Sequence, residues 1–444
     1  MTIALKFGGS SLADISQIQK AVEIVRGNPE RKYVVVSAPG KRSPADMKMT
    51  DIFYHWHEAE SAGRSCRALR KRIFRRYADI VRGFGLYFDV GRELNEVEEA
   101  LKAGASRDFM ASRGEYLMAK IFALILDYEF VDAAHCIRFD KDGKCNWNLS
   151  FDLTYKALID LGDQGAVIPG FYGADINGKD IVTFSRGGSD VTGAIVARAV
   201  MAKLYENWTD VDGLYCADPT VVKNPLLLAS ATYAEVRELS YMGAKVVHPM
   251  AMYPVARAGI PTRICNTNNP KSPGTLITSG GDVQSRSRGV AGVAGRAGFA
   301  AVRVERALMN EELGDAHTVL GILLKHRVRF DHSPGGIDTM SYVIDQHDMS
   351  DTLAKTIVDE IREQCMADDV RLDRGIAMIA IVGEGMVNRI GMSRDVYAAL
   401  AAAGINVRIQ NQGSSELNIL VGVNETDYER AIQAIYNACI APVV

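Results

Sequence analysis

The sequence predicts an α/β protein with a mainly parallel sheet in its first part and a repeated ferredoxin-like module in its last part. Three observations support this prediction. Short apolar runs alternate with segments of helical period, the composition changes near residues 278–298, and the chain after that point contains an internal repeat.

The apolar runs of the first part are rich in β-branched residues. Continuous apolar runs of this kind are typical of parallel strands that are buried on both faces. The runs are TIALKF, KYVVVSA, GAVIPGF and DIVTFS.

Residues 64–85 (RSCRALRKRIFRRYADIVRGFG) predict an amphipathic helix. Leu69, Ile73, Tyr77 and Val81 recur at helical spacing, and arginines occupy the other positions. Two interpretations of the basic face stay open, a solvated helix surface and an arm that binds nucleic acid.

The last part of the chain repeats itself with an offset of 77 residues. Residues 302–304 align with residues 379–381, and the helix and strands that follow align without a gap. Each copy predicts a βαββαβ module, and the two modules should pack side by side and form an interface. The glycine-, serine- and arginine-rich stretch at 278–298 predicts the preceding domain boundary.

Composition excludes several classes of protein. The chain has 444 residues, with 51 Lys and Arg against 54 Asp and Glu, so it lacks the positive charge of a general nucleic-acid binder. No apolar run is long enough to span a bilayer, and no signal peptide is evident, so we expect no membrane partner. Seven scattered cysteines without a C-x-x-C pair predict reduced thiols, no metal site and a cytoplasmic location.

Several loops of the first part have the composition that anion binding requires. Lys6 precedes a glycine turn in KFGGSS, and a second glycine loop lies in SRGGSD at residues 185–190. Phosphoryl transfer needs such cations and backbone N–H groups around the phosphoryl oxygens. The sequence has no Walker-type G-x-x-x-x-G-K-[ST] and no H-R-D or D-F-G, which excludes P-loop enzymes and protein kinases.

Taken together, these motifs resemble those of the aspartate kinases of the amino-acid kinase family, over essentially the whole chain. The motifs are KFGGSS (6–11), VVSAPGK (35–41), SRGE (112–115), SRGGSD (185–190), WTDVDGLYCADP (208–219), GAKVVHP (243–249) and NQGSSE (411–416). The resemblance implies a catalytic αβα sandwich at residues 1–285 and tandem ACT regulatory modules at 286–444. It places the first module at about 299–370 and the second at about 286–298 plus 371–444.

The resemblance implies phosphorylation of the L-aspartate β-carboxylate by MgATP, giving 4-phospho-L-aspartate. This would be the first step toward lysine, threonine, methionine and diaminopimelate. Two other classes stay open, a related carboxylate or carbamate kinase and an amino-acid sensor with a degenerate kinase domain.

The same resemblance assigns the catalytic roles. Lys6 would neutralise charge on the transferred phosphoryl group, and Asp190 would hold the active-site lysines, although it could instead be a helix N-cap. The residues expected to bind ATP are Lys6, Gly8, Gly9, Ser10, Thr209, Asp210, Tyr215 and Lys245. Tyr215 could also be an ordinary packing residue. Thr220 stands where many relatives have arginine, and Lys223 is a candidate replacement.

The expected substrate pocket recognises both ends of an amino acid. Glu115 would bind the aspartate amine, and Arg186 would form a fork with a carboxylate. Ser37, Thr50 and Ser189 would complete the pocket.

The repeated modules predict binding of an effector amino acid, lysine or alternatively threonine. The expected contacts are Met309, Gly314, Asp315, Ala316 and Asp331. Asp331 would pair with an ε-ammonium group, although it could be only a surface charge. Two modules per chain also predict a homodimer or a dimer of dimers.

Overall fold

The computed structural model describes residues 2–185, 187–244, 249–280, 289–311, 314–387 and 389–441. The chain forms two compact units. The first consists of Met1–Leu214, Leu227–Arg237 and Lys245–Gly281, and the second of Tyr215–Leu226, Glu238–Ala244 and Asp282–Val444. The second unit thus takes in two short segments that a division at residue 285 assigns to the first part.

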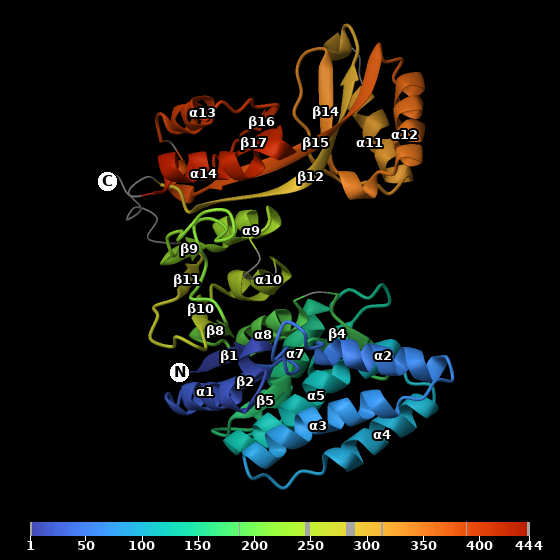
Figure 1. Cartoon of the computed structure of the whole chain (residues 1–444), viewed down its shortest axis with the longest axis vertical. Coiled ribbons are helices and arrows are strands. Elements are labelled where there is room, and N and C mark those ends of the chain that lie inside the picture. The colour runs from blue at the N-terminus through green and yellow to red at the C-terminus, as the bar shows by residue number, and fades with distance from the viewer. Residues whose placement is uncertain are drawn as a thin grey trace. The chain divides into compact units, whose positions relative to one another are not determined.

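In the described part of the first unit, eight strands form one sheet in the order β3-β5-β2-β1-β8-β10-β11-β9. All neighbours are parallel except β10 and β11, which confirms the predicted parallel sheet. The strands are β1 (Ile3–Phe7), β2 (Arg31–Val36), β3 (Glu129–Phe130), β5 (Ala166–Pro169), β8 (Leu204–Thr209), β9 (Ser230–Thr232), β10 (Thr262–Asn266) and β11 (Thr275–Thr278). In Figure 1 β1, β2 and β8 lie side by side.

Helices cover both faces of this sheet, so the first unit has three layers. On one face, α8 packs against β1, β2 and β8, and α7 and α10 pack against α8. On the other face, α5 packs against β2, β3 and β5. The helices are α1 (Ile15–Arg26), α2 (Met49–Ser61), α3 (Arg67–Gly83), α4 (Val90–Lys102), α5 (Arg107–Leu126), α6 (Ala133–Cys136), α7 (Trp147–Ile159), α8 (Gly188–Ala199) and α10 (Pro249–Ala258). A small second sheet contains β4 (Arg138–Phe139), β6 (Tyr172–Asp175) and β7 (Ile181–Thr183). The prediction that the run DIVTFS is a parallel strand buried on both faces is wrong, because β7 is half-buried and pairs antiparallel with β6.

The arginine-rich helix predicted at residues 64–85 is α3. Ile73, Tyr77 and Val81 are buried in the core, as the helical spacing predicts. Arg76 is an exception among the arginines of this helix, because it is buried and forms an ion pair with Asp46.

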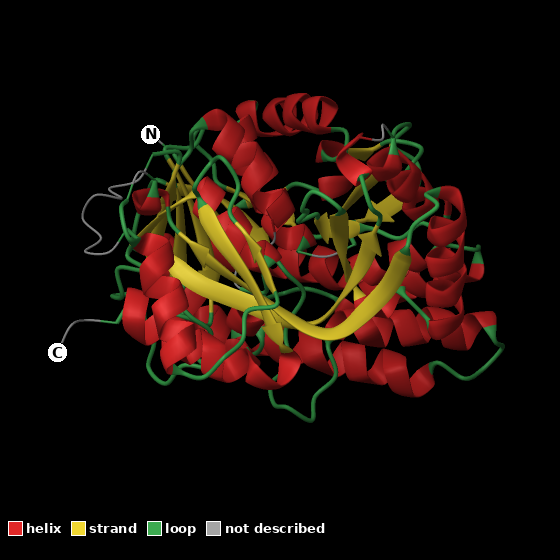
Figure 2. Cartoon of the chain, turned by 90° about the horizontal axis from the view of Figure 1, so that it is seen from above, coloured by secondary structure: helices red, strands yellow, loops and turns green. Residues whose placement is uncertain are grey.

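In the described part of the second unit, six antiparallel strands form one sheet in the order β13-β14-β12-β15-β17-β16. The central strands β12 (Gly292–Glu305) and β15 (Asp369–Val382) each have 14 residues and pair along their lengths. The other strands are β13 (Phe330–His332), β14 (Thr339–Asp345), β16 (Ile409–Asn411) and β17 (Asn418–Asn424). In Figure 2, where all strands are yellow, the long curved strands are β12 and β15.

The predicted repeat is confirmed by the helices of this unit. The helix α11 (Asp315–Lys325) begins 77 residues before α13 (Met392–Ala402), and α12 (Asp351–Gln364) begins 77 residues before α14 (Tyr428–Cys439). The two modules do more than pack side by side, because β12 and β15 run through both of them. A bulge between Arg296 and Phe299, with Gly298 at φ 88°, marks the passage from one module to the other along β12.

Of the two short segments of the second unit, one packs on its sheet and the other contacts its helix α14. Leu239 and Met242, at the end of α9 (Tyr233–Tyr241) and just after it, share a core cluster with Ala294 and Met378. The backbone N–H of Leu226 donates a hydrogen bond to the Tyr436 hydroxyl at 2.9 Å. In the whole described part of the chain, no helix is both long and apolar enough to cross a membrane.

Candidate active site

Lys6 and Asp190 form a nearly buried ion pair at the centre of the first unit. Lys6 lies on β1 and is 8% exposed, and its Nζ lies 2.6 Å from Oδ1 of Asp190. Asp190 lies in the first turn of α8, which Gly187 precedes as the N-cap residue, so Asp190 is not the cap itself. The structure therefore brings the two predicted catalytic residues together.

Backbone hydrogen bonds join the glycine turn after β1 to β8 and to the loop after β2. The N–H of Gly8 donates to the carbonyl of Trp208 at 3.0 Å, and the N–H of Gly40 donates to the carbonyl of Gly9 at 2.8 Å. A Cβ atom on Gly40 would lie 2.5 Å from the Gly9 carbonyl group, so only glycine fits there. A Cβ atom on Gly8 would lie 3.4 Å from Nζ of Lys6, which places the ammonium group directly beside the turn.

Two predicted pocket serines lie at the same edge of the sheet. Ser37 follows β2, and its N–H donates to the carbonyl of Phe7 at 3.2 Å. Ser189 lies at the start of α8, so close to Gly170 after β5 that a Cβ atom on that glycine would be 2.6 Å away. The carboxyl ends of parallel strands meet at one edge, where α/β proteins bind ligands.

Glu115 lies in the interior of α5 and is 5% exposed. Burial raises the pKa of Glu115 to about 8, although hydrogen bonds from the backbone of Ala38 and of Glu115 itself oppose this shift. Among the described residues, its Oε2 atom has no hydrogen-bond partner. A ligand cation at this oxygen would supply the missing partner and would favour the ionised carboxylate over the protonated form that burial favours.

The loop after β2 links the glycine turn after β1 to Glu115. Gly40 contacts the glycine turn after β1, and Ala38, two residues earlier, donates to Glu115. Thr50 is half-buried at the start of α2, next to Met49, which lies 3.8 Å from the Cβ position of Gly114. The glycine turn, the loop after β2 and the start of α2 therefore converge near Glu115.

The remaining predicted residues lie at the end of β8, in the second unit, or outside the described residues. The Thr209 hydroxyl, at the end of β8, donates to Oδ1 of Asp210 at 3.2 Å. Tyr215 is half-buried and belongs to the second unit, as does Thr220, whose N–H and hydroxyl bond to Asp218. Arg186 and Lys245 lie outside the described residues. Among the described residues, no three His, Cys, Asp or Glu side chains form a group that could hold a metal ion.

The sequence did not identify Arg76 as the residue that supports the loop after β2. Arg76 donates to the carbonyls of Gly40 at 2.9 Å and Ala13 at 3.1 Å. Burial would raise the pKa of Asp46, but hydrogen bonds from the Arg42 backbone and Arg72, with the charge of Arg76, lower it overall. The signal was available, because position 76 falls on the apolar side of α3 between Ile73 and Ile80.

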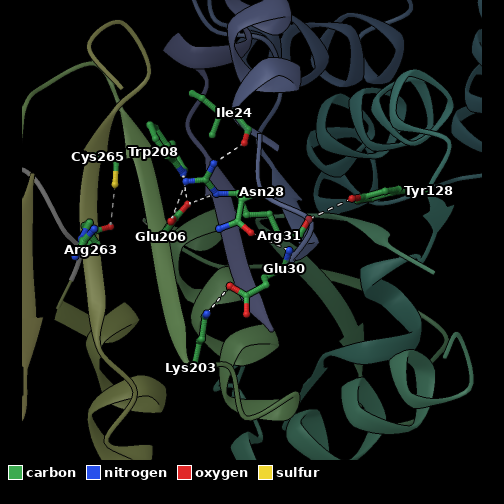
Figure 3. Close-up of polar contacts among 10 residues, drawn as sticks. All are labelled: Ile24, Asn28, Glu30, Arg31, Tyr128, Lys203, Glu206, Trp208, Arg263 and Cys265. Carbon is green, nitrogen blue, oxygen red and sulfur yellow. Dashed lines mark hydrogen bonds and ion pairs between the residues drawn. The ribbon is translucent and has the colours of Figure 1, made fainter. Parts of the chain in front are cut away.

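On the face of β8 opposite Asn207, polar contacts of Glu206 stabilise the sheet. Glu206 accepts two hydrogen bonds from the Arg31 guanidinium, at 3.0 and 3.1 Å, and one from the Trp208 indole at 2.9 Å. Figure 3 shows Arg31 between this carboxylate and the carbonyl of Ile24. These contacts connect β8 to β2 across β1 on the face opposite Lys6 and Asn207.

In the second unit, the predicted effector residues lie in the first module. Asp331 lies on β13, where its Oδ2 accepts from Arg296 at 3.2 Å and its Oδ1 accepts from the Tyr241 hydroxyl. Arg296 also donates to Asp345 at 2.8 Å.

The other predicted effector residues surround the start of α11. Gly314 has φ 113° and precedes the helix, and Asp315 accepts from Arg306 at 3.0 and 3.1 Å. Met309 is buried, and the carbonyl of Ala316 accepts from the Tyr342 hydroxyl at 3.5 Å.

Comparisons with known proteins agree with this architecture. The amino acid kinase family matches residues 1–266, and the ACT domain family matches residues 379–439. The chain is 37% identical over 453 residues to aspartokinase 3 of Bacillus subtilis, covering 99% of each chain. It is 25% identical to the lysine-sensitive aspartokinase 3 of Escherichia coli, covering 98% of each.

A solved structure is also similar. The aspartate kinase of Clostridium acetobutylicum, described as an allosteric enzyme, superposes with a TM-score of 0.90 at 42% identity, covering 98% of this chain and 100% of that one. The chain therefore belongs to the amino acid kinase family, among the aspartate kinases that carry C-terminal ACT domains.

Proposed function

We propose that this aspartate kinase transfers the γ-phosphoryl group of ATP to the β-carboxylate of L-aspartate and releases 4-phospho-L-aspartate and ADP. The observation that carries the proposal is the Lys6–Asp190 pair beside the glycine turn, linked by the loop after β2 to the buried carboxylate of Glu115. The Lys6–Asp190 pair with the glycine turn suits a phosphate group, and the carboxylate of Glu115 suits an amine.

The chemistry needs charge stabilisation more than proton transfer. The β-carboxylate of aspartate is already ionised at neutral pH, so one of its oxygens can attack the γ-phosphorus without a general base. The bond to the β,γ-bridging oxygen breaks, and its electrons leave with ADP. Lys6 would offset the negative charge of the phosphoryl oxygens, and the N–H groups of Gly9 and Ser10 would donate to them. Mg²⁺ would accompany ATP and add further positive charge.

Glu115 supports an amino-acid substrate with a free α-ammonium group. Its Oε2 atom lacks a partner among the described residues, and a substrate ammonium would supply both a hydrogen bond and a counter-charge. Arg186, expected to grip a carboxylate, stays a prediction from the sequence.

A substrate comparison tests the proposal against a related carboxylate kinase. We expect ADP release with L-aspartate, little with L-glutamate, and none with N-acetyl-L-glutamate, which has no ammonium group. ADP formation would be followed in a coupled assay. Activity with N-acetyl-L-glutamate above that with L-aspartate would contradict the role of Glu115, and no activity with any of them would support a sensor instead.

We also propose that L-lysine is the feedback effector and binds the first ACT module. The name of the Escherichia coli relative includes lysine sensitivity, and Asp331 offers a half-buried carboxylate on β13. A lysine ε-ammonium would replace one of the hydrogen bonds that Tyr241 and Arg296 now give to Asp331. Three further statements stay predictions: that the reaction is the first step of lysine, threonine and methionine synthesis, that the protein is a homodimer, and that it is cytoplasmic.

The variant Asp331→Ala should lose most of its response to lysine. We expect the lysine concentration for half inhibition to rise about 10-fold or more, since coupling between allosteric sites is commonly 1–3 kcal/mol. Activity would be titrated with lysine and with threonine, and Asp338→Ala, an exposed acid of the same module, would serve as the control. Unchanged lysine inhibition would exclude Asp331, and inhibition by threonine alone would make threonine the effector.

A further inference from the structure

Asn207 is a buried polar side chain beside the catalytic pair. It lies on β8 and is 3% exposed. Its amide nitrogen donates to Oδ1 of Asp190 at 3.1 Å, and its amide oxygen accepts a long hydrogen bond from Nζ of Lys6 at 3.4 Å. With the 2.6 Å ion pair, the three side chains form a closed triangle of polar contacts.

The sheet register produces this triangle. In the parallel pairing of β1 with β8, Lys6 lies opposite Asn207. Strand residues alternate between faces, so Tyr205 shares the face of Asn207, and its hydroxyl donates to the backbone carbonyl of Asp190 at 3.2 Å. The start of α8 is therefore tied to β8 by two neighbouring side chains.

An amide suits this position better than a carboxylate or an apolar side chain. It can accept from the ammonium group and donate to the carboxylate at once, which neither a carboxylate nor an apolar side chain can do. It also leaves the charges of Lys6 and Asp190 balanced. An ammonium group has three N–H donors, so these two contacts leave one for a phosphoryl oxygen.

We propose that Asn207 is a positioning residue for phosphoryl transfer. It fixes the Lys6–Asp190 pair so that the remaining N–H of Lys6 is directed to the phosphoryl group. The inference rests on the proposed catalytic role of Lys6, because Asn207 acts through that lysine.

The test combines two variants with a matched control. Asn207→Leu keeps the approximate volume and removes both hydrogen bonds, and Asn207→Asp keeps an acceptor but adds a negative charge beside Asp190. The control is Thr154→Val, which removes a fully buried hydroxyl that bonds to the carbonyl of Cys136. The midpoint of thermal unfolding, kcat and the KM for aspartate would be measured for each.

We expect kcat to fall about 10-fold or more in both Asn207 variants, with the KM for aspartate changing less than about 3-fold. The control should keep the kcat of the unchanged protein. Near-normal kcat in a folded Asn207→Leu or Asn207→Asp variant would overturn the proposal. A rise in KM at unchanged kcat would also overturn it, because that result indicates substrate binding.

A double-mutant cycle separates this inference from the proposed function. In single-turnover assays at high enzyme concentration, Asn207→Leu should cost little further rate once Lys6 is alanine, because the group that it positions is gone. An additive loss would show that Asn207 acts independently of Lys6 and would overturn the inference. Full activity of Lys6→Ala alone would instead contradict the catalytic role of Lys6.

Discussion

Replacing Lys6 with alanine should lower kcat by about 10²-fold or more, since the loss of one preorganised donor or charge at a developing anion has an effect of this size. The charge lies in a nearly buried position beside the glycine turn, where water screens it little. The fold should persist, because Asp190 keeps its hydrogen bond from Asn207. ADP release with aspartate and the midpoint of thermal unfolding would be measured together.

A matched lysine provides the control for this prediction. Lys32 lies on the neighbouring strand β2 and pairs with the exposed Asp163 at 2.7 Å, so Lys32→Ala should retain the normal kcat. If Lys6→Ala kept a kcat close to that of the unchanged protein, the assignment of Lys6 to the phosphoryl group would be wrong.

Replacing Glu115 with glutamine should raise the KM for aspartate about 10²-fold and also change how stability depends on pH. The first effect follows from removing the charge that would pair with the substrate ammonium group in a buried site. Aspartate kinetics at fixed pH would measure it, with Glu129→Gln, an exposed change, as the control. An unchanged KM for aspartate would place the amine elsewhere.

The second effect follows from the pKa of Glu115, which burial raises to about 8. An unfolded glutamate has a pKa of about 4.3, so between these values the folded protein binds more protons than the unfolded chain. Glu115 therefore makes the free energy of unfolding fall as the pH rises from about 4.3 to about 8. The glutamine variant lacks this titration and should unfold at a higher temperature than the unchanged protein at pH 8, which thermal unfolding at pH 6 and pH 8 would check.

The sequence predicted features that a local pattern determines. The continuous apolar runs TIALKF, KYVVVSA and GAVIPGF form the buried parallel strands β1, β2 and β5, and the repeat places α11 and α13 correctly because the same pattern occurs twice. Lys6 and Glu115 were found through motifs. Asn207 was missed because its partners come from β1 and α8, and only the register of the sheet brings them together.

The stretch at 278–298 shows a second limit of sequence patterns. Its glycines predicted a boundary, and the two compact units divide within it, between Gly281 and Asp282, yet β12 begins at Gly292 and continues through Gly298. The bulge between Arg296 and Phe299 accommodates the glycine, and pairing with β15 supplies the hydrogen bonds that local propensity does not favour. Pairing with β15 therefore overrode the local glycine signal only in the last part of the stretch, at residues 292–298.

The shared strands β12 and β15 also have a consequence for cooperativity. At about 3.3 Å per residue, each 14-residue strand is roughly 45 Å long and belongs to both halves of the sheet. Neither half can lose its central strands without removing those of the other, so the two ACT modules should open as one cooperative unit and not as two independent domains. The internal repeat should therefore behave as a single folding unit.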